Sequence, residues 1–344
     1  MSTVIKFGLN ALPPFLKSRK YSTLFVLVDE NSKKHCLPLL KALLPAHQVV
    51  TIKSGERNKT LKTCEFIWEV LLKKNADRNS LILNLGGGVI TDMGAFCAAT
   101  FMRGIDFVNI PTSMLAMTDA AIGGKTAIDF LNYKNMIGSF TTPQLVCIDT
   151  QFLKTLPTKH LVASSSEIFK HALLQNKNET NTLLKKPFLL FSESEKLAII
   201  KKSIRFKMSV VTLDSLDKNL RKQLNLGHTL AHALESYFML YKKTLFHGEA
   251  VALGLIGEAY IAHRFYSLPY DLFLSIVFWY DLNFLKPNIK EINFNTMLKL
   301  MHKDKKNDPL AIKMVLLESE GHFAIDTRVT HSQIKEALKF MSDF

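Results

Sequence analysis

The chain has 344 residues, 47 % of them apolar and 22 % charged, which is enough material for one large or two ordinary folded domains. Its 44 Lys and Arg outnumber its 30 Asp and Glu, giving a formal net charge of +14, but no basic run is typical of a nucleic-acid-binding arm. Composition therefore argues against a nucleic-acid partner and leaves two explanations of the charge, a lysine-rich surface or attraction of a phosphorylated small molecule.

The first half of the chain alternates between short apolar runs and amphipathic stretches. The runs predicted to form strands are Leu24–Val28, Val49–Ile52, Leu81–Leu85, Phe107–Ile110 and Leu145–Ile148. A helical stretch follows Asp29 and continues through Leu44, and the apolar spacing of Leu61–Lys74 predicts another helix. Buried strands that alternate with helices predict an α/β fold with a parallel sheet covered on both faces.

Helical periodicity dominates after Pro157. The predicted helices are Ser166–Gln175, Ser192–Val211, Leu224–Leu240 and Gly248–Phe265, with further helices towards the C-terminus. We therefore place a boundary at Pro157, between an α/β domain at 1–157 and a mostly α-helical domain at 158–344. A cleft between two domains is the default place for a ligand site.

A triple glycine, Gly86–Gly88, stands at the carboxyl end of the third predicted strand, and a helix is expected to start near Val89. Glycines at such a turn let backbone amides approach a pyrophosphate, and a helix N-terminus favours negative charge. Because the run departs from the G-x-G-x-x-G pattern, a structural tight turn explains it equally well. The segment Ser54–Lys59 follows another strand and also has two explanations, which are a ligand-binding loop and a solvated loop.

Polar residues gather in an otherwise apolar stretch further along the chain. Asp119, a glycine pair and Lys125 lie close together, and Lys134 and Asn135 follow. Such groups are costly to bury without a ligand. They suit a substrate with phosphate, carboxylate and hydroxyl groups, whereas a surface loop is the alternative that needs no ligand.

Three histidines lie where one divalent metal ion could be held. His228 and His232 are four residues apart and share a face if the segment is helical, and His247 stands at the expected start of the next helix. Two helical histidines and a distant third ligand are the usual layout of a catalytic zinc site with an open position. By spacing alone both members of the pair would be ligands, and a pair that serves helix capping or packing is the alternative.

The four cysteines, Cys36, Cys64, Cys97 and Cys147, stand in apolar contexts without metal-type spacing. We expect them to be small buried side chains of a protein from a reducing compartment. The N-terminus lacks the basic-then-apolar pattern of a signal peptide, and no apolar run is long enough for a membrane span. These features predict a cytoplasmic protein without a membrane partner.

Seven motifs follow one another along the chain: GGGVITDMGAF, FMRGIDFVNIPTS, DAAIGGKTAID, KNMIGSF, SEIFKHALL, LNLGHTLAHALE and HGEAVALG. In this order they resemble the 3-dehydroquinate synthase family of sugar-phosphate cyclases. Together they cover roughly Ser54–Gly254, with a weaker similarity at Asp304–Lys306. Because members of the wider fold differ in substrate, the alternatives are another sugar-phosphate cyclase and a metal-dependent alcohol or glycerol-phosphate dehydrogenase.

The resemblance implies a Rossmann-like N-terminal domain that binds NAD, an α-helical domain that binds zinc or cobalt, and a homodimer. The family reaction converts 3-deoxy-D-arabino-heptulosonate 7-phosphate to 3-dehydroquinate and phosphate, in the shikimate pathway that leads to chorismate and aromatic amino acids. It proceeds by transient oxidation with NAD, phosphate elimination, reduction, ring opening and intramolecular aldol closure. Because one bound molecule passes through every step, its positioning supplies much of the acceleration.

The resemblance also assigns residues to roles. The metal ligands would be Glu167, His228 and His247, so that His232 becomes a catalytic or substrate-contacting residue and not a fourth ligand. The implied catalytic residues are Asp119, Lys125, Lys170, Asn225 and His232. The implied substrate-binding residues are Arg103, Asp119, Lys125, Lys134, Asn135, Lys170, Lys207, Arg221, Asn225, His232 and Lys305 (or its neighbour Lys306), with Arg103 reaching the neighbouring subunit's site. The implied NAD-binding residues are Ser54, Glu56, Lys59, Gly87, Gly88, Val89, Ile90, Asp92, Thr112, Ser113, Lys125, Lys134, Phe152 and Thr155.

The chain departs from the family pattern at several positions near the implied site. Thr91 stands where the family usually has glycine, Ala120–Ala121 where it has two serines, and Ser164–Ser166 where it has Gly-Leu/Met-Ala. Asn219 replaces another glycine, and we expect it to adopt the left-handed conformation that asparagine tolerates. None of these changes removes an implied metal ligand or lysine, so the resemblance predicts an active enzyme.

Overall fold

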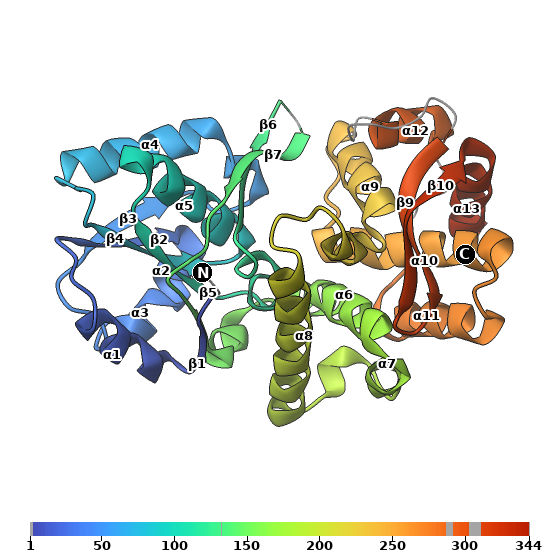
Figure 1. The fold of residues 1–344 in the computed structure, drawn as a ribbon, viewed down its shortest axis with the longest axis horizontal. Helices are drawn as coiled ribbons and strands as arrows, with labels where there is room; N and C mark the ends of the chain where they lie inside the picture. The colour runs from blue at the N-terminus through green and yellow to red at the C-terminus, as the bar shows by residue number, and fades with distance from the viewer. Residues whose placement is uncertain (1–2, 132, 287–291, 303–310, 344) are drawn as a thin grey trace. The chain divides into compact units, whose positions relative to one another are not determined.

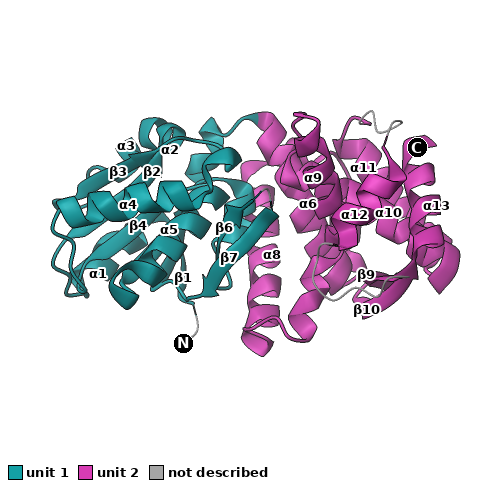
Figure 2. Ribbon diagram, turned by 90° about the horizontal axis from the view of Figure 1, so that it is seen from above, with its two compact units in different colours: residues 1–157 teal, residues 158–344 magenta. Residues whose placement is uncertain are grey.

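The computed structural model describes residues 3–131, 133–286, 292–302 and 311–343, so that Lys305 lies outside the described residues. The chain divides into two compact units, Met1–Pro157 (unit 1) and Thr158–Phe344 (unit 2) (Figure 2). Within the described ranges, every helix is too short or too polar to cross a membrane.

Unit 1 is built around a six-stranded parallel sheet, as the alternation of strands and helices predicted (Figure 1). The strand order is β1 (Ile5–Phe7), β8 (Leu145–Ile148), β5 (Asp106–Pro111), β4 (Leu81–Gly86), β2 (Leu24–Asp29) and β3 (Gln48–Ile52). The central strands β2 and β4 are buried along almost their whole length, which requires cover on both faces of the sheet. No sequence pattern indicated β1, which pairs with β8 in a register that places Ile5 opposite Val146.

The helices of unit 1 follow the strands, and the helical stretch after β2 is divided into two short helices. They are α1 (Leu12–Lys17), α2 (Glu30–His35), α3 (Leu37–Leu40), α4 (Leu61–Lys73) and α5 (Gly88–Thr100), with 3-10 turns at Leu9–Ala11, Glu56–Asn58, Phe101–Arg103 and Thr150–Thr155 and a π turn at Ala116–Ala120. The prediction of a helical stretch through Leu44 is wrong, because α2 ends before Cys36 and α3 ends at Leu40. Pro38 lacks the backbone N–H group that would continue the hydrogen bonding of α2.

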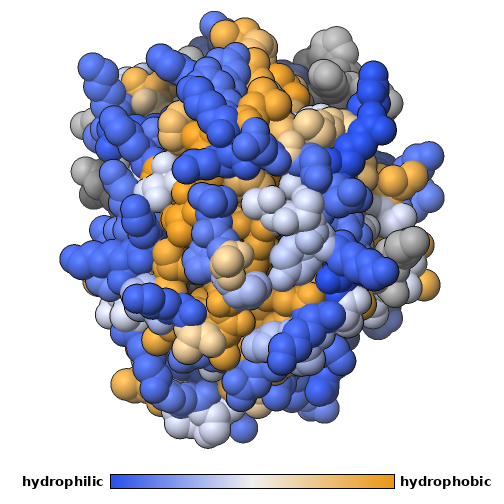
Figure 3. All heavy atoms as spheres, turned by 90° about the vertical axis from the view of Figure 1, so that its left-hand side faces the viewer, coloured by the Kyte–Doolittle hydropathy of each residue, from blue (hydrophilic) through white to orange (hydrophobic). Residues whose placement is uncertain are grey.

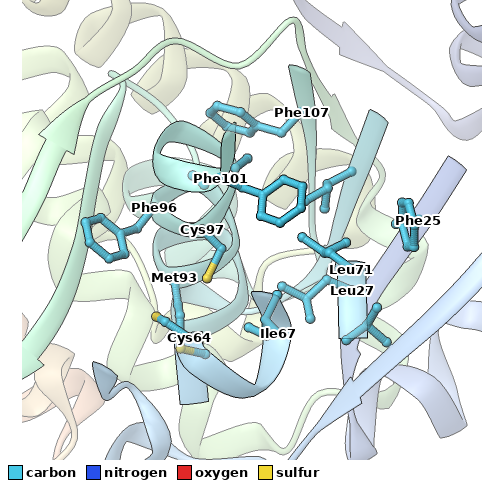
Figure 4. Close-up of a cluster of buried hydrophobic side chains, with 14 of the residues drawn as sticks. Phe25, Leu27, Cys64, Ile67, Leu71, Met93, Phe96, Cys97, Phe101 and Phe107 are labelled. Carbon is cyan, nitrogen blue, oxygen red and sulfur yellow. The ribbon is translucent and has the colours of Figure 1, made fainter. Parts of the chain in front are cut away.

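The core of unit 1 lies where α4 and α5 pack over the sheet (Figure 4). Cys64, Ile67 and Leu71 lie on one face of α4 and are at most 1 % exposed, which follows the spacing that predicted this helix. They belong to one cluster with Met93 and Cys97 of α5. All four cysteines are buried and free, as their apolar contexts predicted.

An antiparallel hairpin of β6 (Lys125–Phe130) and β7 (Tyr133–Phe140) stands outside the main sheet of unit 1 (Figure 1). Sequence patterns did not indicate it, because its strands mix exposed polar and apolar positions. Asn135 in β7 has a φ of 53°, the left-handed conformation that asparagine tolerates, and its backbone N–H donates to Asp129. The hairpin thus carries three of the residues that the resemblance implies, Lys125, Lys134 and Asn135.

Unit 2 is mostly helical, as predicted. Its helices are α6 (Thr158–Gln175), α7 (Lys177–Leu184), α8 (Glu193–Leu213), α9 (His228–Leu240), α10 (His247–Tyr266), α11 (Tyr270–Asn283), α12 (Phe294–His302) and α13 (His331–Asp343), with 3-10 turns at Phe188–Leu190 and Leu220–Asn225. An antiparallel hairpin of β9 (Ala311–Ser319) and β10 (His322–Thr330) separates α12 from α13. The sequence patterns did not indicate this hairpin, although the helices expected towards the C-terminus are present, and Gly321, with a φ of 83°, makes the turn between the two strands.

Helix α9 starts where a glycine turns the chain. Gly227 has a φ of 81° and follows a 3-10 turn, so the helix predicted from Leu224 begins only at His228. The turn therefore makes His228 the first residue of its helix.

Glycines of α10 allow close backbone contacts around the starts of α9 and α10. A Cβ atom on Gly254 would lie 1.9 Å from the carbonyl oxygen of Gly227. A Cβ atom on Gly248 would lie 1.8 Å from the carbonyl oxygen of Ala163 in α6. These contacts bring the start of α9 against the third turn of α10, and the first turn of α10 against α6.

The surface of unit 1 includes apolar areas. Figure 3 shows a face of the molecule on which apolar atoms gather in the middle, bordered by hydrophilic side chains. The exposed apolar side chains of unit 1 include Leu39 of α3 and Val49 of the edge strand β3, which are 43 % and 38 % exposed. Surfaces of this kind are typical of contacts with other proteins.

Candidate active site

Three helices of unit 2 bring Glu167, His228 and His247 together. Glu167 lies on α6, His228 is the first residue of α9, and His247 is the first residue of α10. Nε2 of His228 lies 3.2 Å from Oε1 of Glu167, and Nε2 of His247 lies 3.5 Å from the same oxygen. The three ligand atoms lie within 4.8 Å of one another, a spacing that suits one metal ion.

Glu167 is the buried centre of this cluster. Its side chain is fully buried, whereas those of His228 and His247 are 12 % and 26 % exposed, so the cluster opens on the histidine side. Neither oxygen of Glu167 accepts a hydrogen bond of ordinary geometry from the described residues, although Oε2 forms an ion pair with Lys170. A buried carboxylate placed in this way is suited to bind a cation.

The second ring nitrogen of each histidine also faces an oxygen. Nδ1 of His228 lies 3.1 Å from the carbonyl oxygen of Leu226, and Nδ1 of His247 lies 3.2 Å from Oε2 of Glu235. Carbonyl and ionised carboxylate oxygens only accept hydrogen bonds, so Nδ1 carries the proton in both contacts. In the neutral ring Nε2 is then left with a lone pair that faces Glu167.

Neighbouring charges shift the pKa values of the cluster. Burial raises the pKa of Glu167, but the charge of Lys170 is the largest opposing effect, and the pKa lies well below its ordinary value. Burial and the charge of Lys170 lower the pKa of His228, which keeps this ring neutral. Burial lowers the pKa of His247, but Glu235 and Glu167 raise it to about 10. Glu167 and His228 are therefore in the forms that bind metals, whereas His247 has to release a proton when an ion binds.

Two other glutamates fix the helix starts that carry the histidines. Glu258 of α10 is 1 % exposed, and its carboxylate accepts hydrogen bonds from the backbone N–H groups of Gly227 (2.6 Å) and Thr229 (3.1 Å). It replaces the side-chain cap that Gly227 cannot supply to α9. Burial raises the pKa of Glu258 to about 8, although these amides lower it. Glu249 accepts from the N–H group of Phe246 at 2.9 Å and caps α10.

Unit 2 also buries three cations that the resemblance assigns to substrate binding. Lys170, Lys207 and Arg221 are 1 %, 5 % and 3 % exposed. Besides its ion pair with Glu167, Lys170 donates from Nζ to the carbonyl oxygen of Leu224 at 2.6 Å, and Arg221 donates from Nη1 to a backbone carbonyl oxygen at 2.9 Å. Three cations in one unit are a source of positive potential, which suits an anionic ligand.

His232 and Asn225 are exposed, unlike the three cations. The ring of His232 lies one turn after His228, with its centroid 5.4 Å from that of His228 and 6.2 Å from that of His247. His232 forms a second trio with Glu235 and His247, whose ligand atoms also lie within 4.8 Å of one another. The two members of the histidine pair therefore have different surroundings.

Most of the implied NAD residues of unit 1 follow the ends of strands at one edge of the sheet, whereas Lys125 and Lys134 lie on the β6–β7 hairpin. Ser54–Lys59 follows β3, Gly87–Asp92 follows β4, Thr112–Ser113 follows β5, and Phe152–Thr155 follows β8. Because these strands are parallel, their carboxyl ends meet at the same edge. The loops after β4 and β5 approach closely, since a Cβ atom on Gly87 would lie 3.3 Å from Oγ of Ser113.

The first turn of α5 presents backbone amides to this edge. Gly87 is the residue before the helix and forms no side-chain cap, and Thr91 is the first residue whose N–H group donates back, at 3.0 Å to the Gly87 oxygen. The preceding amides have no partner inside the helix and suit an anionic ligand. The side chains of Ile90 and Phe152 are buried, so only their backbone atoms are available to a cofactor.

Lys59 links the loop after β3 to α5 and to the β6–β7 hairpin. Its Nζ lies 2.6 Å from Oδ2 of Asp92 and 2.6 Å from Oδ1 of Asn135. Burial lowers the pKa of Lys59, but Asp92 and Glu56 raise it by more, so the ammonium form is retained. Glu56 in turn lies 3.5 Å from Nζ of Lys134. Implied cofactor residues and implied substrate residues are therefore in direct contact.

Asp119, Lys125 and Arg103 are placed differently within unit 1. Asp119 is half-buried in the π turn, and Lys125 is exposed at the start of β6. Arg103 precedes β5 and therefore lies at the amino edge of the sheet, opposite the loops that carry the implied NAD residues. Met102 and Arg103 have φ values of 48° and 69°, a strained backbone of the kind that is often found at functional positions.

Most departures from the family pattern fit their surroundings. Thr91 is buried, and its Oγ1 donates to the carbonyl oxygen of Gly88 at 3.2 Å. Ser166 donates to a carbonyl oxygen of its own helix at 2.7 Å. The expected left-handed conformation of Asn219 is wrong, because its φ is −137°. The left-handed residue of this turn is Asp217, two positions earlier, whose φ is 58°.

Sequence reasoning missed Glu235 and Glu258. Glu235 lies three residues after His232 and so shares the helix face of the histidine pair, and this spacing was an available signal. Glu258 had no comparable signal, because it reaches the start of α9 only through the packing of α10.

Comparison with known protein families extends over most of the chain. Residues 49–163 match the family described as 3-dehydroquinate synthase N-terminal, and residues 164–307 match that described as 3-dehydroquinate synthase C-terminal. The chain belongs to the 3-dehydroquinate synthase family. The family and the lyase class that the seven motifs predicted are therefore confirmed.

Relatives and solved structures agree with this family. The 3-dehydroquinate synthase of Parabacteroides distasonis is 37 % identical over 334 residues, which are 96 % of this chain and 94 % of the relative. A crystal structure of 2-deoxy-scyllo-inosose synthase with carbaglucose-6-phosphate, NAD+ and Co2+ has a TM-score of 0.86 and 24 % identity, covering 98 % of this chain and 96 % of its own. The 2-epi-5-epi-valiolone synthase of Streptomyces hygroscopicus, solved with NAD+ and Zn2+, has a TM-score of 0.86 and 22 % identity, covering 100 % and 97 %. These structures confirm the predicted fold class.

Proposed function

We propose that this member of the 3-dehydroquinate synthase family converts 3-deoxy-D-arabino-heptulosonate 7-phosphate to 3-dehydroquinate and phosphate in the shikimate pathway. The observation that carries the proposal is the convergence of Glu167, His228 and His247, in a chain whose relative along almost its whole length is a 3-dehydroquinate synthase. A carboxylate and two imidazoles on three helices match a catalytic metal site with an open position.

The residues present fit a zinc or cobalt ion. One carboxylate oxygen and two imidazole nitrogens are donors that these ions prefer, and the Glu167 oxygens accept no ordinary hydrogen bond from the described residues. Cyclases of the same fold were solved with Co2+ or Zn2+. Glu167, His228 and His247 would hold the ion, which supplies Lewis-acid polarisation of substrate hydroxyl groups when bound.

NAD is proposed to bind unit 1, which makes 1–157 the nucleotide domain and 158–344 the metal and substrate domain. The amides at the start of α5 and the close approach of Gly87 to Ser113 support a pyrophosphate at the carboxyl edge of the sheet. When bound, the nicotinamide supplies reversible hydride transfer. The remaining proposed contacts are Ser54, Glu56, Lys59, Gly88, Val89, Ile90, Asp92, Thr112, Lys125, Lys134, Phe152 and Thr155.

The substrate is proposed to be held through its anionic groups. Lys170, Lys207 and Arg221 are buried cations, and their positive charge would attract a phosphate and a carboxylate. His232 is exposed beside the metal ligands and is suited to carry a proton. The proposed catalytic residues are Asp119, Lys125, Lys170, Asn225 and His232. Arg103, Lys134, Asn135 and Lys305 complete the proposed substrate contacts.

We also propose that the chain acts as a cytoplasmic homodimer in which Arg103 completes the neighbouring subunit's site. The exposed position of Arg103 at the amino edge of the sheet, away from the other implied residues of unit 1, supports a role in another subunit. A mixing experiment tests this directly. Arg103→Ala and His228→Ala should each be inactive, and their mixture should regain part of the activity, because mixed dimers contain one intact site. No recovery in mixed dimers would show that Arg103 acts within its own subunit.

Steady-state assays decide between this function and its alternatives. We expect release of phosphate and 3-dehydroquinate without net change in NADH absorbance, loss of activity with a chelator, and recovery with Zn2+ or Co2+. Turnover of sedoheptulose 7-phosphate alone would indicate a different cyclase. Accumulation of NADH would indicate a metal-dependent alcohol or glycerol-phosphate dehydrogenase, and either result would overturn the proposal.

A further inference from the structure

Glu235 is a buried carboxylate beside the proposed metal ligands. It lies on α9, on the helix face of His228 and His232, and its side chain is 2 % exposed. Its Oε2 atom lies 3.2 Å from Nδ1 of His247, the ring nitrogen opposite the one that faces Glu167. A buried acid is costly to ionise unless donors compensate it, and the N–H group of His247 is such a donor.

The two proposed histidine ligands differ in the acceptor that Nδ1 meets. His228 meets a neutral carbonyl oxygen, that of Leu226, only two residues away in the chain. His247 meets a carboxylate that comes from a different helix, α9. Each histidine is the first residue of its helix, so no earlier turn of that helix fixes either ring. For His247, the carboxylate of Glu235 on the neighbouring helix orients the ring.

We propose that Glu235 is a positioning residue of the metal centre. By accepting the Nδ1 proton of His247, it directs Nε2 of that ring towards Glu167 and increases the affinity for a divalent ion. This inference rests on the proposed function, because it takes Glu167, His228 and His247 as the ligands. It extends that function to a residue that does not bind the ion itself.

The same side chains allow a competing arrangement. His232, Glu235 and His247 also place three ligand atoms within 4.8 Å of one another. In that arrangement Glu235 would bind the ion directly, and both Glu167 and His228 would be dispensable for metal binding. The two arrangements therefore predict opposite effects of substitutions at Glu235 and at His228.

Co2+ titration of the metal-free full-length chain, followed by visible absorption, tests the proposal. Glu235→Gln keeps the size of the side chain and an acceptor oxygen but removes the charge. We expect its Co2+ affinity to fall about 10- to 100-fold, with absorption bands of unchanged shape because all three ligands remain. At saturating Co2+ its kcat should return towards the wild-type value, which loss of a reacting group would not allow.

Glu249→Gln is the matched control. It makes the same charge change two residues from His247, but the Glu249 carboxylate caps the N–H group of Phe246 and not the imidazole ring. Glutamine keeps an oxygen that accepts from this N–H group, so the start of α10 is retained and the Co2+ affinity should equal that of the wild-type chain. An equal loss in both variants would mean that only the local charge matters, and the positioning role would be wrong.

His228→Ala separates failure of the inference from failure of the proposed function. If the wild-type chain binds Co2+, His228→Ala does not, and Glu235→Gln binds normally, the inference is wrong and the function stands. If Glu235→Gln loses Co2+ while His228→Ala retains it, the competing arrangement is correct and the inference is again wrong. If the wild-type chain binds no Co2+, both are overturned.

Nitrogen NMR of the wild-type chain makes the test independent of variant folding. With 15N-labelled histidine and bound Zn2+, His247 should carry its proton on Nδ1 and show the metal shift on Nε2. A proton on Nε2 of His247 would contradict the role of Glu235.

Discussion

The ammonium nitrogen of Lys59 lies 2.6 Å from the side-chain oxygen of Asn135. The contact joins the loop after β3 to the β6–β7 hairpin, and Asp92 of α5 accepts from the same ammonium group. Lys59 and Asp92 are proposed to bind NAD, whereas Asn135 is proposed to bind substrate. The buried ammonium group of Lys59 therefore contacts both a residue proposed to bind NAD and a residue proposed to bind substrate.

Replacing Lys59 with methionine should weaken the binding of both ligands. The variant keeps an unbranched side chain but removes the cation from Asp92 and the donor from Asn135. Hydrogen bonds to charged groups contribute about 1.5–3 kcal/mol, which corresponds to a rise of roughly ten- to a hundredfold in the Kd of NAD. We expect the KM of the substrate to rise as well, as measured by titration calorimetry and steady-state kinetics. The exposed Lys53, replaced by methionine, is the control, and an unchanged KM in Lys59→Met would exclude a role of the Asn135 contact in substrate binding.

Substitutions in the histidine pair should separate metal binding from chemistry. His228→Ala removes a proposed ligand, so the purified variant should contain no stoichiometric metal and show no turnover. His232→Ala should retain metal and lose rate, because His232 lies outside the trio around Glu167. Elemental analysis of both proteins, together with phosphate release, measures the difference. Equal loss of metal in both variants would mean that His232 is itself a ligand.

Gly254→Ala should destabilise unit 2. The added methyl group would lie 1.9 Å from the backbone oxygen of Gly227, and backbone atoms cannot move aside without displacing the start of α9. We expect a loss of about 3 kcal/mol in the free energy of unfolding, measured by denaturant titration. Gly257→Ala on the same helix is the control, because the atoms nearest to its methyl group would be side-chain atoms of Leu230 and Met341 and not backbone atoms. A similar loss in both variants would exclude the backbone contact as the cause.

Glu195 should stabilise the start of α8 in a pH-dependent manner. The N–H group of Ser192 and the ammonium group of Lys186 donate to its carboxylate and lower its pKa to about 2 from the ordinary 4.5. A lowered folded-state pKa means that the stabilisation is complete above pH 4.5 and is lost as the pH falls towards 2. Glu195→Gln should therefore lower the Tm at neutral pH, with a difference from wild type that shrinks in acid. Glu193→Gln in the same turn is the control, and a difference that is independent of pH would exclude the charge of Glu195 as its source.

The predictability of the fold varied with burial. Strand β4 was predictable because its run LILNL is apolar except for Asn84, which is typical of a strand that is buried on both faces. Strand β1 has only three residues and is partly exposed, so its sequence carries no pattern. The hairpin β9–β10 was missed because its apolar residues lie in a segment where helical periodicities dominate on both sides.

The sequence was sufficient to predict which residues form the candidate site, but it did not show which of them face one another. His228 and His232 share one helix face, and spacing alone cannot decide which of them faces a metal ion. The position of Glu167 on another helix makes the difference, and no local pattern encodes that packing. The family resemblance supplied the assignment, while the contact between Glu235 and His247 depends on how α9 meets α10.

The pairing of β1 with β8 has a consequence for biosynthesis. Ile5 pairs with Val146, and the nearby contact of Leu9 with Asp149 spans 140 positions of the chain. On the ribosome, β1 is made early but has no partner until β8 has left the exit tunnel. A nascent chain that stalls before Leu145 therefore presents the apolar edge of β5 unpaired, and this intermediate is the one for which chaperones and aggregation would compete.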